Sequence, residues 1–106
     1  MVAEFASDKK AENIIVLDMH KVTNYCDYFV ICTGNSDRQV KAIAEGIEEQ
    51  LEKVGMKVTH KQADKESRWI LLDLGSVIAH IFERETRDFY GLEHLWQEAK
   101  KVNLEK

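Results

Sequence analysis

The sequence predicts a small α/β (α+β) domain, and two observations lead to that fold class. Short apolar runs rich in β-branched residues, typical of strands, are interspersed with segments whose apolar residues recur at helical spacing. The order α-β-β-α-β-β-β-α then predicts a mixed five-stranded sheet with helices on at least one face. The length of 106 residues falls within the usual size of one domain, about 100–150 residues. We therefore expect a single domain over residues 1–106.

The first elements are a weak helix or partly ordered start at 1–12 and two strands at 13–19 and 27–34. Both strand segments are compact and rich in valine and isoleucine, which favour strands. The N-terminal segment is polar and offers few apolar anchors to a core: Val2, Phe5 and Ala6.

A helix over 36–54 is the clearest element of the sequence. Its apolar residues recur at steps of three and four and define one helix face: Val40, Ile43, Ala44, Ile47, Leu51 and Val54. Ser36 followed by Gln39 matches a capping box, in which two side chains satisfy free backbone N–H groups. Gly55 is suited to the left-handed conformation that ends many helices.

The second half predicts a strand at 56–61, a charged loop at 62–67, a β-hairpin at 69–83 and a helix at about 91–103. The strand–helix–strand unit from 27 to 61 predicts a right-handed parallel crossover, and the two hairpin strands should be antiparallel. The final helix rests on a stripe of apolar residues: Leu92, Leu95, Trp96, Ala99 and Val102.

The hairpin predicts one wholly apolar face and one mixed face. A two-residue turn at Leu74–Gly75 would place Asp73 opposite Ser76 and Trp69 opposite His80. Because side chains alternate along strands, the apolar face carries Ile70, Leu72, Val77, Ala79 and Ile81, and the mixed face carries Trp69, Leu71, Asp73, Ser76, Ile78, His80 and Phe82. Asp73 and His80 would lie several residue pairs apart, too far for a catalytic dyad. The mixed face is either structural, with Asp73 fixing the turn and His80 a satisfied half-buried ring, or a recognition surface.

Composition excludes several classes of protein. A hydrophobic fraction of 44% with 32% charged residues is typical of a globular domain. The net charge of −4 and the scattered basic residues argue against general nucleic-acid binding. No apolar run approaches the roughly 18 residues of a membrane span, so we expect a cytoplasmic protein with no membrane contact. Cys26 and Cys32 would lie about 20 Å apart along a strand, too far for a disulfide.

The sequence contains no motif that predicts a catalytic, metal or cofactor site. Its histidines and cysteines lack the spacing of zinc ligands. The segment TGNSDR, at 33–38, could hold an anion at a helix start, but a helix cap accounts for the same residues. No pair of carboxylates one residue apart stands on a strand to hold magnesium for nucleotidyl transfer. Arg87 and Tyr90, which precede the final helix, are either a structural buttress or interface groups.

Four segments, in this order and spacing, resemble the Iojap-like ribosomal silencing factor family (RsfS): KAENIIVLDM, DYFVICTGNSDRQVKAIA, WILLDLGSVIAHIF and R-x-F-Y-G-L-E-H-L-W. The resemblance covers nearly the whole chain, from Lys10 to Trp96. It implies a domain that resembles nucleotidyltransferases without their active site. It also implies a non-enzymatic factor that binds the large ribosomal subunit through ribosomal protein number fourteen. Bound there, the factor blocks joining of the small subunit and represses translation, chiefly under nutrient limitation.

The resemblance also implies which residues bind the partner. The family's signature for partner binding corresponds to Trp69, Leu72, Asp73, Leu74 and Gly75, followed by Ser76. Further motif positions are His80, Arg87 and Tyr90, which either contact the partner or brace the hairpin. Relatives usually have Glu-Gly where this chain has Gln62-Ala63, and commonly an acid where it has Ser76, so contact with a basic partner would be less negative here.

Two alternatives stay open beside this function. One is a nucleotide-binding transferase of the same fold, suggested by the TGNSDR junction. The other concerns the free protein: the resemblance implies a monomer on the ribosome, whereas a homodimer could pair through the mixed face in its absence.

Overall fold

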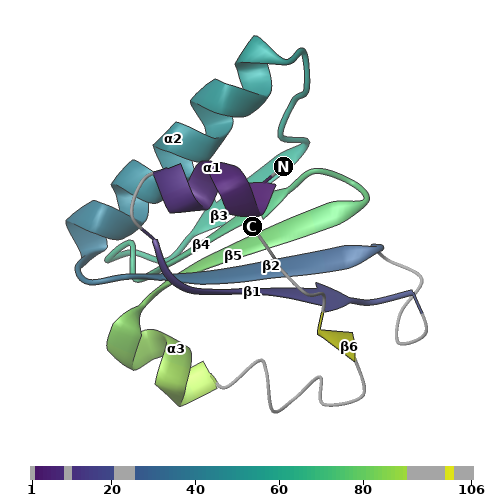
Figure 1. Cartoon of the computed structure of the whole chain (residues 1–106). Coiled ribbons are helices and arrows are strands. Elements are labelled where there is room, and N and C mark those ends of the chain that lie inside the picture. Colours follow the sequence, from purple (N-terminus) through teal and green to yellow (C-terminus); the bar gives the residue numbers. More distant parts are fainter. Residues whose placement is uncertain (1, 9–10, 21–25, 91–99, 102–106) are drawn as a thin grey trace.

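The computed structural model describes residues 2–8, 11–20, 26–90 and 100–101. Its elements are α1 (Val2–Asp8), β1 (Glu12–Asp18), β2 (Tyr28–Gly34), α2 (Asp37–Lys53), β3 (His60–Ala63), β4 (Trp69–Asp73), β5 (Val77–Glu83), α3 (Arg84–Tyr90) and β6 (Lys100–Lys101). The strands form one sheet in the order β3-β4-β5-β2-β1-β6. Helices α1 and α2 lie on one side of the sheet and α3 on the other (Figure 1).

The predicted fold class is confirmed, because five longer strands form a mixed sheet with helices packed on it. Strands β2 and β5 are parallel, whereas β1–β2, β3–β4 and β4–β5 are antiparallel. It follows that β3 runs in the same direction as β2, as a parallel crossover requires, although β4 and β5 lie between them. The short β6 adds a sixth strand beside β1.

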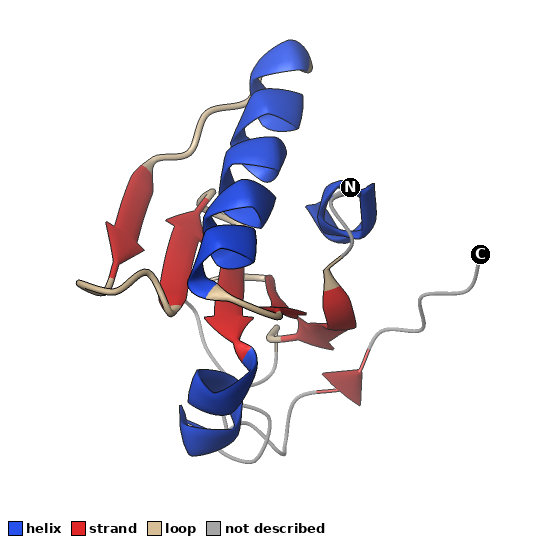
Figure 2. Ribbon diagram, turned by 90° about the vertical axis from the view of Figure 1, so that its left-hand side faces the viewer, coloured by secondary structure: helices blue, strands red, loops and turns tan. Residues whose placement is uncertain are grey.

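Helix α2 lies against the sheet, as Figure 2 shows. The predicted apolar stripe of this helix packs in the core. Val40, Ile43, Ala44, Ile47 and Leu51 are fully buried in the larger core, together with Val2 and Ala6 of α1. Val54 was wrongly included in the stripe: it is the C-terminal cap of α2 and is 54% exposed. A second, smaller core lies on the opposite face of the sheet and contains Leu17, Met19, Cys26, Phe29, Ile31 and Phe82.

The ends of α2 follow from local chemistry. The Ser36 hydroxyl accepts a hydrogen bond from Gln39 N at 3.2 Å, as the capping box predicts. The reciprocal bond differs, because Gln39 Oε1 accepts from Asn35 N at 2.5 Å. At the other end Gly55 has a φ of 78°, and Met56 N donates to Leu51 O, which is the pattern of a glycine-terminated helix.

Three element predictions need correction. The strand predicted at 56–61 is formed by His60–Ala63 instead, because the chain must first return from the end of α2 to the sheet. Helix α3 was not predicted, since among its described side chains, residues 84–87, the buried one is Arg87 and not an apolar residue. Of the helix predicted at 91–103, residues 91–99 lie outside the described part of the chain, and Lys100–Lys101 pair with β1 as a strand.

The hairpin turn lies one residue later than predicted. Leu74 N donates to Val77 O at 2.9 Å, so Gly75 and Ser76 are the central residues of the turn. Asp73 therefore pairs with Ile78, and Trp69 pairs with Phe82. Only the first central residue, Gly75, has a positive φ, of 88°, which matches a type II′ turn. The change of register is even, so the apolar and mixed faces keep the predicted side chains.

The turn conformation generates a prediction for Gly75→Ala. A Cβ at this position would meet no atom within 4 Å, so the effect should come from backbone strain alone. We expect the free energy of unfolding to fall by about 1–2 kcal/mol, measured by urea denaturation. Ser76→Ala, at the other central position, is the matched control and should change it by less than about 0.5 kcal/mol. Equal effects would contradict the assigned turn type.

Candidate partner-binding surface

The residues implied in partner binding divide into exposed and buried groups. Gly75 and Ser76 are exposed, while Trp69, Asp73 and Leu74 are half-buried. Three others are buried: Leu72 is 0%, His80 5% and Arg87 8% exposed. Tyr90 is the last residue of α3, and its side chain lies outside the described part. The accessible candidates thus come from strand β4 and the turn that follows it.

The turn is held by a hydrogen bond to Asp73 at its start and by hydrogen bonds from two neighbouring segments. Asp73 Oδ1 accepts from Gly75 N at 2.8 Å, which confirms that Asp73 fixes the turn. Ser76 O accepts from Asp27 N at 2.7 Å and Tyr28 N at 3.1 Å. On the other side, the backbone N–H and the hydroxyl of Thr59 both donate to Asp73 O at 2.8 Å. The exposed turn is therefore a pre-organised feature.

Asp73 and His80 are closer than predicted. Asp73 pairs with Ile78 and His80 pairs with Leu71, and these two pairs are neighbours on one face of the hairpin. The structure nevertheless gives no hydrogen bond between the two side chains. The Asp73 carboxylate bonds the turn, and the His80 ring bonds Trp69. No acid–base pair forms.

A histidine that the sequence analysis did not single out lies beside the turn. His20 Nδ1 is 2.6 Å from Asp18 Oδ1, and its Nε2 is 3.3 Å from Asp27 Oδ1. The hydrogen bond with Asp18 raises the pKa of His20 above its ordinary value. Only the Asp-x-His spacing at 18–20 could have indicated this cluster, because the second aspartate, Asp27, directly precedes a different strand, β2.

Trp69 and His80 form the centre of the mixed face. Trp69 Nε1 donates to His80 Nδ1 at 3.2 Å, and the indole stacks on Phe82 with ring centroids 5.2 Å apart. Because the indole can only donate, the neutral imidazole must carry its proton on Nε2, which has no hydrogen-bond partner among the described residues. Burial lowers the pKa of His80 to about 4, so the ring is neutral at pH 7.

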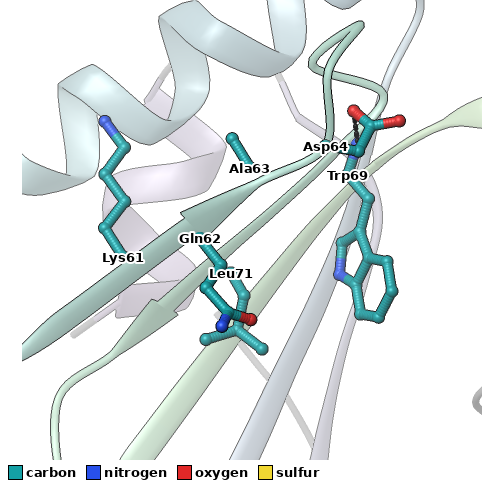
Figure 3. Close-up of a pocket in the computed structure, with 6 residues that line it drawn as sticks. All are labelled: Lys61, Gln62, Ala63, Asp64, Trp69 and Leu71. Atoms are coloured by element: carbon teal, nitrogen blue, oxygen red, sulfur yellow. Dashed lines mark hydrogen bonds between the residues drawn. The ribbon is translucent and has the colours of Figure 1, made fainter.

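An open groove of about 550 Å³ lies beside Trp69, at the edge of the sheet. It is lined by Lys61, Gln62, Ala63, Asp64, Trp69 and Leu71. Figure 3 shows Gln62, Leu71 and Trp69 on one side of the sheet, and Lys61 and Ala63 on the side of α2. Trp69 and Gly75 are six residues apart, which is about 20 Å along a strand. A partner that contacts both must span most of the hairpin.

Arg87 makes the contacts of a structural buttress, one of the two roles predicted for it. Its Nη1 donates to Asn13 O and to Thr33 Oγ1, both at 2.6 Å. These contacts tie α3 to β1 and β2 and do not reach the hairpin.

The two cysteines are free and buried, as predicted, and burial raises the pKa of Cys32 to about 12. Such a thiol is unreactive at neutral pH.

In the TGNSDR segment, at 33–38, side chains of the segment itself bind backbone N–H groups at the start of α2. Asp37 Oδ1 accepts from Arg38 N at 2.9 Å, and a Cβ at Gly34 would lie 3.0 Å from Val40. The nearby polar groove of about 340 Å³ is lined by two neutral polar residues, four carboxylates and one guanidinium: Asn35, Ser36, Asp37, Glu66, Glu83, Glu85 and Arg68. This surface disfavours a phosphate anion.

Across the described ranges no three histidine, cysteine, aspartate or glutamate side chains are grouped to hold a metal, and no helix could span a membrane.

Comparison with known proteins identifies the family. The family described as "Ribosomal silencing factor during starvation" matches residues 1–106. The chain belongs to this family of ribosomal silencing factors. It is 43% identical to the ribosomal silencing factor RsfS of Bacillus subtilis over 105 residues, covering 99% of this chain and 89% of the relative. It is also 35% identical to the chloroplastic Iojap protein of Zea mays, covering 97% of this chain and 45% of that protein.

Solved structures of relatives share the fold of this ribosomal silencing factor family member. A crystal structure from Chromobacterium violaceum matches with a TM-score of 0.88 and 31% identity, covering 100% of this chain and 88% of the other. One from Bacillus halodurans matches with a TM-score of 0.85 and 36% identity, covering 97% and 94%. The family comprises ribosomal silencing factors.

The buttress generates a stability prediction for Arg87→Met. The change would leave Thr33 Oγ1 and Asn13 O without their donor in a buried site, and should lower the free energy of unfolding by about 2–3 kcal/mol. Arg84→Met is the matched control, because Arg84 bonds Glu12 and Asn35 on the surface and should cost less than about 1 kcal/mol. Urea denaturation measures both, and equal losses would refute the buttress.

The lowered pKa of His80 predicts how stability depends on pH. The unfolded chain binds a proton at this residue near pH 6.5, whereas the folded chain does so only near pH 4. The free energy of unfolding should therefore fall by about 3 kcal/mol as pH decreases between these values. In His80→Gln this part of the pH dependence should be absent. Urea denaturation at several pH values gives the free energy of unfolding of both proteins. In the difference between them, the contributions of the other titrating groups cancel.

Proposed function

We propose that this chain binds the large ribosomal subunit through ribosomal protein number fourteen and sterically blocks joining of the small subunit. Translation would thereby be repressed, chiefly when nutrients are scarce. The observation that carries the proposal is the match to the silencing factor family over the whole chain, together with the exposed, pre-organised turn at the signature positions. Such a factor acts where ribosomes are, in the cytoplasm of a bacterium, and binds them as a monomer.

The surface around the turn suits a basic protein. The half-buried Asp73 and Asp18 and the exposed Asp27 lie at this end of the sheet. Positive side chains of a partner would be attracted there, which increases the rate and specificity of association more than the final affinity. The pre-organised turn adds little entropic cost on binding.

Burial suggests how the signature residues divide their roles. We assign direct contact to the signature residues that are half-buried or exposed: Trp69, Asp73, Leu74, Gly75 and Ser76. Leu72 packs in the core beneath α2, while His80 orients Trp69 and Arg87 holds α3. These three residues would support the surface from within. Tyr90 keeps its proposed place in the interface through its motif position alone.

A nucleotide-dependent transferase is the competing function. The acidic groove and the capped start of α2 argue against a triphosphate site. Titration calorimetry with nucleoside triphosphate and magnesium tests this directly, and we expect no saturable heat. Saturable binding that is lost when Asp37 and Glu83 are replaced would establish the competing function.

The central experiment follows subunit joining. Separated ribosomal subunits are mixed with and without the protein, and the products are resolved by sedimentation. We expect the protein to reduce the amount of full ribosomes and to travel with the large subunit. If full ribosomes form equally well at saturating protein, the proposal is wrong.

Charge at position 76 should change affinity in opposite directions. Ser76→Arg places a positive charge in the proposed contact with a basic protein, and should weaken binding to the large subunit at least about tenfold, or ~1.4 kcal/mol. Ser76→Glu should strengthen it several-fold. The matched control is Ala42→Arg, which adds the same charge at an exposed position of α2 and should leave affinity unchanged. If Ala42→Arg and Ser76→Arg behave alike, the turn is not the contact.

A further inference from the structure

The imidazole of His20 bridges two aspartates at the end of the sheet that carries the exposed turn. Its Nδ1 is 2.6 Å from Asp18 Oδ1 and its Nε2 is 3.3 Å from Asp27 Oδ1, and the Tyr28 ring packs perpendicular to it with centroids 5.3 Å apart. These three are the titratable groups that contact the ring among the described residues, and β6 pairs Lys100 with Asp18 through the backbone. The His20 and Asp27 side chains are each 51% exposed, so solvent and a partner can reach both.

This geometry requires a protonated ring. A neutral imidazole has one N–H group, so only one of its nitrogens can donate to a carboxylate. Here each nitrogen faces a carboxylate oxygen, and both contacts are attractive only when the ring carries two protons and a positive charge. The hydrogen bond with Asp18 raises the pKa of His20 above its ordinary value, which brings the change of charge closer to neutral pH.

Loss of the proton would separate the ring from Asp27. Asp18 holds the ring at the shorter distance, and its Oδ1 also accepts from His20 N at 3.0 Å. The neutral ring would therefore keep its one N–H on the side of Asp18. Its Nε2 lone pair would then face the Asp27 carboxylate, and the two repel each other. The Asp27 carboxylate is thereby released to bind another cation.

Asp27 lies beside the exposed turn. Its backbone N donates to Ser76 O at 2.7 Å, which joins the two segments directly. Burial raises the pKa of the Cys26 thiol, and the negative charges of Asp27 and Asp73 raise it further, so both carboxylates lie close enough to act on one thiol. A partner that docks on the turn therefore meets Asp27 at the same end of the sheet.

We propose that His20 controls the docking of a basic protein on the turn: the neutral ring exposes the Asp27 carboxylate to the partner, and the protonated ring withholds it. This inference rests on the proposed function, which supplies the basic partner. An ammonium or guanidinium group of the partner would take the place of the imidazolium beside Asp27, so docking releases a proton from His20. Because such coupling is reciprocal, the affinity for the partner increases as pH rises.

Binding to purified large ribosomal subunits at about pH 6, 7 and 8 tests the proposal, with His20→Asn as the variant that cannot titrate. We expect His20→Asn to bind about two- to fivefold more tightly than the unaltered chain at the lowest pH, and equally at the highest. The ratio of the two affinities removes the titration of the ribosome itself. A ratio that stays the same across this range would overturn the proposal.

His20→Lys gives the opposite fixed state. Its permanent positive charge beside Asp27 should hold the affinity at the low-pH value of the unaltered chain throughout the range. His60→Asn is the matched control, because His60 is another exposed histidine, opposite Asp73 on the other side of the hairpin, and this variant should keep the pH dependence. If the pH dependence disappears in His60→Asn and persists in His20→Asn, the assignment to His20 is wrong.

Nuclear magnetic resonance of the free protein tests the cluster without ribosomes. The His20 ring signals should titrate with a midpoint above 6.5, the Asp27 amide signal should shift with the same midpoint, and Asp27→Asn should lower it. An unchanged midpoint in Asp27→Asn would contradict the proposed bridge. Failure to bind large subunits at any pH would refute the proposed function, whereas binding with the same pH dependence in His20→Asn would refute only the role of His20.

Discussion

The parallel pairing of β2 with β5 is the interaction on which the rest of the structure depends. Seven residue pairs join the two strands, from Tyr28–Val77 to Gly34–Glu83. Both strands are covered on both faces, by α2 on one side and by the smaller core on the other. Because β5 leads back through the turn to β4, this ladder fixes where Gly75 and Ser76 emerge. It also fixes Thr33, on which Arg87 of α3 is anchored.

The candidate surface combines a rigid end with a supported aromatic face. At one end, hydrogen bonds from Thr59, Asp27 and Tyr28 hold the backbone of the turn. About 20 Å away along β4, Trp69 is oriented by a buried, neutral imidazole. Rigid presentation of a small loop and one aromatic side chain is a common basis of protein recognition. This geometry supports the proposed role in protein binding.

The sequence predicted most elements correctly, because α2, β1, β2 and the hairpin faces depend on local periodicity. It failed where a longer-range contact decides. The turn at Gly75–Ser76 depends on which residue needs a positive φ, and alternation alone cannot distinguish neighbouring even shifts of register. Helix α3 was not predicted because, among its described side chains, the buried one is the charged Arg87. For the site, the turn role of Asp73 was predictable from its side chain, whereas the His20 cluster requires two strands to meet.

The hydrogen bond between Trp69 of β4 and His80 of β5 makes local separation of these two strands measurable. The indole proton is shared between two neighbouring strands, and it can exchange with solvent deuterium only when that contact separates. Its exchange rate therefore measures how often β4 and β5 come apart near the groove. The signal of this indole proton in a nuclear magnetic resonance spectrum would thus report how often the hairpin opens locally, with no label added to the protein.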